Sequence, residues 1–172
     1  NRTEDIDDAN NFLMSTNLEL KAISQLDLYS FKKMKIIYTS RPVVNFMNQD
    51  TMVKDHIYTF EGLDMESIDY IEFEYQLKDN EMHSINLYIS KENLLESVNN
   101  YTNVKLGENE YTIYYTGKGN ILKAILKVQK NNKPYYIVFD KIYKDGDKIN
   151  IDFADEKEVE HYIKLWLAGQ EN

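Results

Sequence analysis

Five short runs of apolar and aromatic residues follow one another in the second half of the chain, and turn residues separate them. Each break contains Gly or Asn, which accept the backbone angles of tight turns, and each run is rich in Ile, Val, Tyr or Phe. Because strands joined by tight turns pair with each other, this spacing predicts an antiparallel meander. The five expected strands are residues 104–106, 111–116, 121–130, 134–143 and 149–153.

The third of these runs has the alternation expected of a strand that buries one face. Leu122, Ala124, Leu126 and Val128 are apolar, and the positions between them include Lys123, Lys127 and Gln129. Successive side chains of a strand point to opposite faces, so the apolar set predicts the core side and the lysines the other. Ile125 interrupts the polar face.

The residues after the meander predict an amphipathic helix over residues 155–168. Asp155 and Glu158 resemble a capping box, with acidic side chains at the positive end of the helix dipole, and Gly169 suits the end of the helix. Apolar side chains recur at helical spacing at Val159, Tyr162, Ile163, Trp166 and Leu167. We expect this stripe, which contains the single Trp, to pack on the sheet.

The first half of the chain predicts a hairpin and several less regular elements. Residues 71–77 alternate between apolar and polar, which is typical of a half-buried strand, and residues 78–81 lead to a partner strand at 84–89. Residues 33–39 predict a further strand, with 42–47 returning against it. Helices are expected over 51–60 and over 16–29, where alternation of apolar residues leaves a strand as the alternative, and a short helix or loop over 91–99.

Together these patterns predict one α+β domain over residues 1–172. It would have an antiparallel sheet of about seven or more strands with helices packed on one face. We expect residues 1–11, which are polar and acidic, to form a flexible tail. If the domain has two parts, we expect the join near residues 97–103, because residues 1–100 carry 9 basic and 18 acidic side chains and residues 101–172 carry 11 of each.

Composition excludes several classes of function. The net charge of −9 argues against a general nucleic-acid binder, which needs a basic surface. The chain has no Cys, so it has no disulfides and no thiolate metal sites or cysteine nucleophiles. Its sequence contains no apolar run long enough for a transmembrane helix. No cofactor motif is present, and we expect no cofactor.

Three groups of residues invite a catalytic or metal-binding interpretation. His56, His83 and His161 are too dispersed to predict a metal site, and residues 145–147 fit a hairpin turn better than a calcium loop. Glu72 and Glu74 share one face of a strand, a spacing that a pair of glycosidase carboxylates can use. Alternating Glu is also the usual outer face of a half-buried sheet, and we favour that interpretation.

The segment from Lys118 to Lys133 contains no acidic residue, and it predicts a binding surface. Lys123 and Lys127 share a strand face, and Tyr114 and Tyr136 on neighbouring strands would stand beside them. A basic face with tyrosines suits an anionic glycan, a wall polymer or lipid headgroups. The alternative is a solvated lysine face without a ligand.

The pattern of the second half resembles a known group of proteins. Residues 110–115 and 124–128, the Asn132-Lys133-Pro134-Tyr135-Tyr136 segment and the closing helix are similar to the extracytoplasmic domains of low-GC Gram-positive lipoproteins and membrane-anchored anti-sigma factors. The resemblance covers about residues 101–168. It implies an exported sensor or accessory domain and assigns no catalytic residue.

These observations predict a non-catalytic extracytoplasmic domain that binds a protein partner or an envelope component. We expect it to be lipoprotein-like or membrane-tethered through an N-terminal segment that has been removed. One alternative is an enzyme acting on cell-wall polysaccharide through Glu72 and Glu74. The other is a cytosolic interaction protein.

Overall fold

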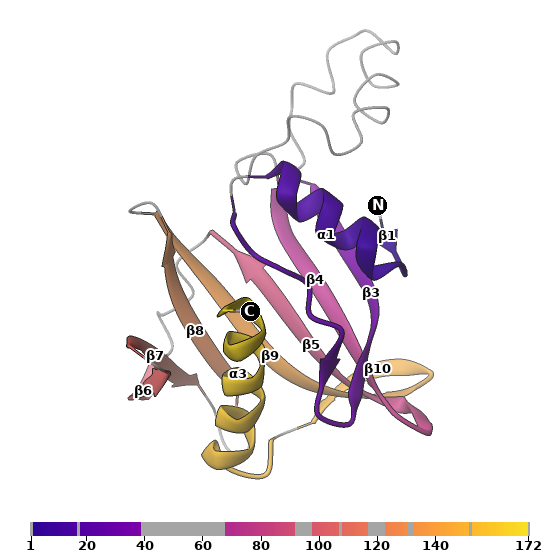
Figure 1. The fold of residues 1–172 in the computed structure, drawn as a ribbon. Helices are drawn as coiled ribbons and strands as arrows, with labels where there is room; N and C mark the ends of the chain where they lie inside the picture. Colours follow the sequence, from indigo (N-terminus) through magenta and orange to yellow (C-terminus); the bar gives the residue numbers. More distant parts are fainter. Residues whose placement is uncertain are drawn as a thin grey trace, which may run out of the picture.

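The computed structural model describes residues 2–16, 18–38, 68–91, 98–106, 108–116, 123–130, 133–151 and 153–171. In this part of the chain, ten strands form one sheet in which every paired strand is antiparallel, together with two helices (Figure 1). The predicted α+β fold is therefore confirmed. The elements expected at residues 42–47 and 51–60 lie outside the described residues, as does most of the element expected at 91–99.

The sheet order is β1-β3-β4-β5-β9-β8-β7-β6, with β2 paired to β3 and β10 paired to β9. Each strand from β6 to β10 pairs with the next, so the predicted five-strand meander is confirmed. The helices are α1 (Ile6–Ser15) and α3 (Glu156–Glu171). The strands are β1 (Arg2–Thr3), β2 (Gln25–Leu26), β3 (Tyr29–Tyr38), β4 (Ile68–Leu77), β5 (Asn80–Ser90), β6 (Val98–Leu106), β7 (Asn109–Thr116), β8 (Lys123–Lys130), β9 (Lys133–Asp145) and β10 (Asp147–Ile151).

Strands from both halves of the chain belong to one sheet. β5 pairs with β9 over eight positions, from His83 opposite Tyr143 to Ser90 opposite Tyr136. The segment where we expected a join, residues 97–103, contributes most of β6, which continues the same sheet through β7. Within the described part of the chain, hydrogen-bonded strands therefore connect the acidic first half to the neutral second half.

Both helices lie on the same face of the sheet, and the main core lies between them and the strands (Figure 1). Trp166 of α3 packs edge-on against Phe139 of β9, with ring centroids 6.4 Å apart. Tyr75 of β4 is buried and donates its hydroxyl to the carbonyl of Ile23 at 2.9 Å. The sheet side of this core includes Ile71, Phe73, Ile85, Leu87, Ile89, Ile113, Ala124, Leu126 and Ile137.

Residues 2–15 contain β1 and α1, so the prediction of a flexible tail over residues 1–11 is wrong. Asp5 caps α1, because its Oδ1 accepts from the backbone N–H groups of Asp7 at 2.8 Å and Asp8 at 3.2 Å. The helix buries Phe12 and Leu13 in the core. The acidic residues that suggested a solvated tail are the N-cap and the first turn of a helix, where negative charge is favourable.

The prediction of a helix over residues 16–29 is also wrong. Residues 18–24 run irregularly before β2, and both Glu19 (φ 56°) and Asp27 (φ 55°) have left-handed backbone angles that a helix excludes. The side chain of Asn10 holds this segment, since it accepts from the Ala22 N–H at 2.7 Å and donates to the Ala22 carbonyl at 3.1 Å. These contacts come from α1, so a local sequence pattern does not reveal them.

The last helix is longer than predicted, because α3 continues through Gly169 to Glu171. Gly169 faces Ile23 of the irregular segment, and a Cβ at this position would overlap the Ile23 side chain. The glycine therefore permits close packing of the helix on residues 18–24. It does not end the helix.

Candidate functional site

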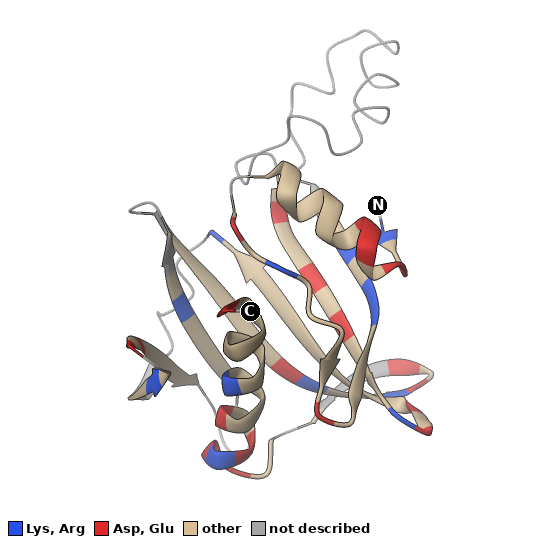
Figure 2. Cartoon of the chain, in the orientation of Figure 1, with Lys and Arg blue, Asp and Glu red and all other residues tan. Residues whose placement is uncertain are grey.

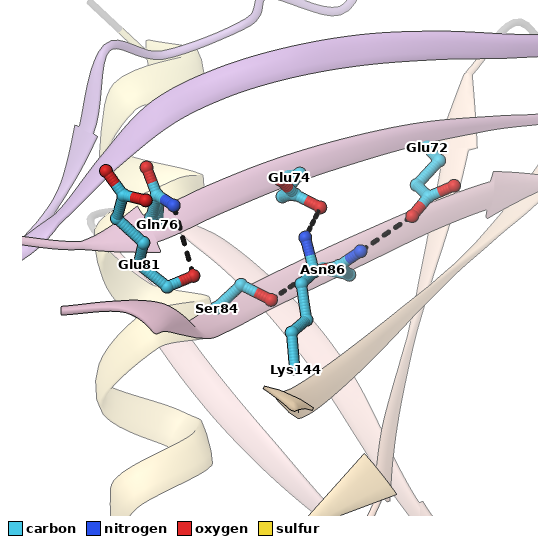
Figure 3. A network of polar contacts seen from close by, with 7 residues as sticks. All are labelled: Glu72, Glu74, Gln76, Glu81, Ser84, Asn86 and Lys144. Carbon is cyan, nitrogen blue, oxygen red and sulfur yellow. Dashed lines mark hydrogen bonds and ion pairs between the residues drawn. The ribbon is translucent and has the colours of Figure 1, made fainter. Parts of the chain in front are cut away.

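A network of buried polar side chains occupies the sheet face opposite the helices (Figure 3). Glu72 and Glu74 alternate with the core residues Ile71, Phe73 and Tyr75 along β4, and they remain only 4% and 2% exposed. The expectation that these glutamates form a solvated outer face is therefore wrong. Acidic residues recur along the β4 ribbon (Figure 2).

Neighbouring strands supply partners for both carboxylates. Asn86 of β5 donates from Nδ2 to Oε1 of Glu72 at 2.6 Å, and Ser84 donates its hydroxyl to Oδ1 of Asn86 at 2.9 Å. Lys144 of β9 forms an ion pair with Glu74. Because buried carboxylates are costly without such partners, this arrangement explains how two glutamates are accommodated inside the sheet.

The network extends along the strands to Tyr88 and Asp140. Asp140 lies opposite Asn86 in the β5–β9 register and is buried. Burial raises the pKa of the Tyr88 hydroxyl well above its usual value, and the nearby carboxylates of Glu72 and Asp140 raise it further. Tyr88 therefore stays protonated and acts as a hydrogen-bonding group within the network.

Glu72 and Glu74 line neither of two cavities formed by the described residues. The smaller cavity lies at the β4–β5 turn, and the larger lies beside α3. Since both carboxylates are engaged by their neighbours, their main visible role is to stabilise the sheet.

The larger cavity, of about 680 Å³, lies at the end of β7 and β8 where the two strands separate. Their pairing runs from Thr116 opposite Lys123 to Thr112 opposite Lys127, and beyond that position the register shows no further pairs among the residues described. This cavity, which we call the β7–β8 cavity, is lined by Glu19, Leu20, Asn109, Glu110, Tyr111, Thr112, Tyr114, Lys127, Val128, Trp166, Leu167, Gln170 and Glu171.

The last turn of α3 joins the walls of the β7–β8 cavity. Gln170 donates to the Lys21 carbonyl and accepts from the Lys21 N–H, each at 2.8 Å. Glu171 accepts from Tyr111 Oη at 3.0 Å and from Asn109 Nδ2 at 3.1 Å. Burial raises the pKa of the Tyr111 hydroxyl, and its hydrogen bond to Glu171 adds to the shift. The helix end thus connects residues 18–24 with β7.

Trp166 forms part of the cavity wall, although the residue as a whole is almost fully buried. Its indole Nε1–H has no hydrogen-bond partner in the described structure. The indole is nearly perpendicular to the Phe139 ring, at 86°. Because this chain has a single Trp, its fluorescence reports directly on the cavity.

The structure brings together two of the four residues predicted to bind a ligand. Tyr114 and Lys127 both line the β7–β8 cavity. Tyr136 lies directly opposite Lys127 in the β8–β9 register, but it is only 4% exposed. Lys123 lies on the same strand face as Lys127, and its side chain is outside the described structure.

Sequence reasoning missed the acidic part of this cavity. Glu19, Glu110 and Glu171 come from the irregular segment, β7 and the end of α3, and they line the cavity together with Lys127. Glu110 and Lys105 lie opposite each other on β7 and β6. Only the fold brings these segments together, and a helix predicted to stop before Gly169 omits Glu171.

The remaining candidate groups form no metal centre in the part of the chain that is described. His83 stacks near Tyr143, His161 lies 3.2 Å from Asp27, and His56 is outside the described residues. No group of three or more His, Asp or Glu side chains is placed to hold a metal ion there. Gly146 has a φ of 79° in the β9–β10 turn, which confirms the hairpin predicted at residues 145–147.

None of the described helices has both the length and the apolar character needed to cross a bilayer. No protein-family model matches the chain, and searches of curated proteins and of solved structures found no match.

Proposed function

We propose that this chain is a non-catalytic binding domain and that the β7–β8 cavity is its binding site. The observation that carries the proposal is the cavity itself, in which Tyr111, Tyr114 and Lys127 of the sheet meet the end of α3. Aromatic and polar groups that converge in a concave site are typical of ligand pockets. The bound component is an envelope polymer or a protein partner.

Binding is favoured over catalysis because the best catalytic candidates are engaged elsewhere. Glu72 bonds to Asn86, and Glu74 forms an ion pair with Lys144. A glycosidase needs an acid and a second carboxylate beside a sugar-binding cleft, whereas the described cavities are lined by other residues.

We further propose that the domain lies outside the cytoplasm and is tethered to the membrane. Support comes from the absence of Cys and from the likeness of residues 101–168 to exported domains. Protease treatment of intact cells followed by detection of the full-length protein tests this placement. Degradation in intact cells is expected, and protection until lysis would instead favour a cytosolic interaction protein.

The binding site is tested by sedimentation of the purified domain with isolated cell envelopes. Tyr111→Ala and Tyr114→Ala are expected to reduce co-sedimentation, because both residues line the cavity. Tyr143→Ala is the matched control, since Tyr143 is a similarly half-buried tyrosine on β9 that contacts His83 and does not line the cavity. If all three variants sediment like the unaltered domain, the cavity is not the binding site.

The anionic-polymer form of the proposal has its own test. An anionic wall polymer is the alternative ligand. If it is the component bound, the double variant Lys123→Glu, Lys127→Glu should abolish the binding, because the two lysines share one strand face. Unchanged binding of the double variant to that polymer would show that Lys123 and Lys127 are not part of the binding site.

A further inference from the structure

We infer that the β7–β8 cavity binds an amino sugar unit, that is, a hydroxyl-rich glycan residue with a free, positively charged amino group. This inference rests on the proposed binding function and specifies its ligand.

The charge of the cavity selects against an anion. Among the residues whose side chains the structure describes, three glutamates (Glu19, Glu110 and Glu171) and one lysine (Lys127) line it. Lys105, opposite Glu110, lies outside the lining, so the cavity wall itself remains negative. A concave site of one sign attracts ligands of the opposite sign, and a cation therefore fits this site better than a phosphate or uronate.

Aromatic side chains provide a second feature that suits a cationic sugar. Tyr111 and Tyr114 line the cavity together with Trp166. Aromatic faces attract ammonium groups through their quadrupole, and they also pack against apolar ring faces. Carboxylates next to aromatic rings therefore form a suitable environment for an ammonium group on a ring-shaped ligand.

The hydrogen-bonding groups of the cavity favour a sugar over the lysine side chain of a peptide. Thr112 and Asn109 line the cavity beside the glutamates, and their hydroxyl and amide groups can form hydrogen bonds. A sugar carries hydroxyl groups that both donate and accept. A lysine side chain has no hydroxyl groups, so it would leave the hydrogen-bonding groups of this wall without partners.

Glu19 and Glu110 are the residues through which the inference is tested. Both side chains are exposed at the cavity and neither belongs to the core, so Glu→Gln changes leave the fold intact. Glu171 is unsuitable, because its carboxylate holds Tyr111 and Asn109. Glu108 is the matched control, since it is exposed two residues from Glu110 and does not line the cavity.

The experiment measures binding of a glucosamine tetramer by Trp166 fluorescence and by calorimetry. The N-acetylglucosamine tetramer is the neutral control, and tetralysine is the peptide control. We expect the glucosamine tetramer to bind best and binding to weaken as salt rises. Glu19→Gln and Glu110→Gln should each weaken it roughly threefold, on the scale of exposed ion pairs. Glu108→Gln should bind as the unaltered domain does.

Several outcomes would overturn the inference. Equal binding of the acetylated tetramer, or binding that Glu19→Gln and Glu110→Gln leave unchanged, would show that the amino group is not recognised. Tighter binding of tetralysine, sensitive to the same variants, would identify a basic peptide as the ligand. If neither sugar binds but envelopes still sediment the domain in a Tyr111-dependent manner, the inference fails and the proposed function stands. If envelope binding also fails to depend on Tyr111 and Tyr114, both fail.

Discussion

Replacing Lys144 by Met tests whether the buried network on the far face of the sheet stabilises this protein. The Glu74 side chain is 3% exposed and that of Lys144 is 25% exposed. Removing one partner of a buried ion pair costs roughly 3–5 kcal/mol, because the other charge is left without compensation. Lys33 lies opposite Glu74 in the β3–β4 register and offsets part of this loss. We therefore expect Lys144→Met to lower the free energy of unfolding by about 2–3 kcal/mol.

Replacing the other partner of the ion pair, Glu74, should cost less than replacing Lys144, because the two side chains are buried to different extents. Glu74→Gln leaves the Lys144 ammonium, which can extend to water, and a neutral amide in place of the carboxylate. We expect a loss of about 1 kcal/mol. The double variant Lys144→Met, Glu74→Gln should be more stable than Lys144→Met alone by about 1 kcal/mol, because it removes the unpaired buried charge.

Urea unfolding, followed by Trp166 fluorescence and circular dichroism, measures these differences. The comparison holds when the free energy of unfolding falls with urea concentration at the same slope in each variant. Lys141→Met is the matched control on the same strand. Lys141 pairs with Glu158 at 3.0 Å, but the two side chains are 20% and 27% exposed. We expect this change to cost no more than about 1 kcal/mol. Equal losses for Lys144→Met and Lys141→Met, or a double variant less stable than Lys144→Met, would refute the burial argument.

Three further predictions concern packing, capping and pH. Gly169→Ala should lower the free energy of unfolding by about 1 kcal/mol, since overlap with Ile23 outweighs the gain in helix propensity. The same change should cost less when it is made in an Ile23→Ala background. A stabilised Gly169→Ala variant would contradict the packing. Asp5→Ala should lower the free energy of unfolding by about 1 kcal/mol, because it removes the N-cap of α1. The loss should appear as a lower midpoint of thermal unfolding, and an unchanged midpoint would show that the cap is dispensable. Burial raises the pKa of Tyr162 to about 12, from 10.0, and that of Tyr88 is also raised. The unfolded chain therefore loses these protons first, so stability should be full below about pH 10 and fall as the pH rises toward 12. A free energy of unfolding that stays constant between about pH 10 and pH 12 would contradict this.

Local pattern was sufficient to predict the strands of the second half and their meander. Their side chains alternate with a period of two, and Gly and Asn mark the turns, so each strand and its partner are specified by neighbouring residues. The apolar stripe of α3 was equally local, since Val159, Ile163 and Trp166 follow helical spacing and all three are buried.

The errors occurred where distant segments decide the conformation. The irregular path of residues 18–24 depends on Asn10 of α1, and the continuation of α3 past Gly169 depends on close packing against Ile23. Residues 1–11 looked like a solvated tail, because acidic composition does not distinguish a tail from the capped first turn of a helix.

The residues of the candidate site also fall into two groups, those that the local sequence pattern predicted and those that only the fold brings together. Tyr114 and Lys127 were predicted because they lie on adjacent strands, whose pairing the turn pattern specifies. Glu19 and Glu171 were missed because they are far apart in the sequence and meet only when α3 packs across residues 18–24 and β7.

The sequence alone determined the periodicity of the strands and the last helix, because these depend on side chains only a few residues apart. The tertiary structure decided the burial of Glu72 and Glu74 and the sign of the charge around the β7–β8 cavity. The sequence pattern of alternating Glu on a strand is the same whether the carboxylates face water or, as here, bind Asn86 and Lys144. A carboxylate is buried only when its partners arrive from other strands, and the order of strands in the sheet is a property of the whole chain.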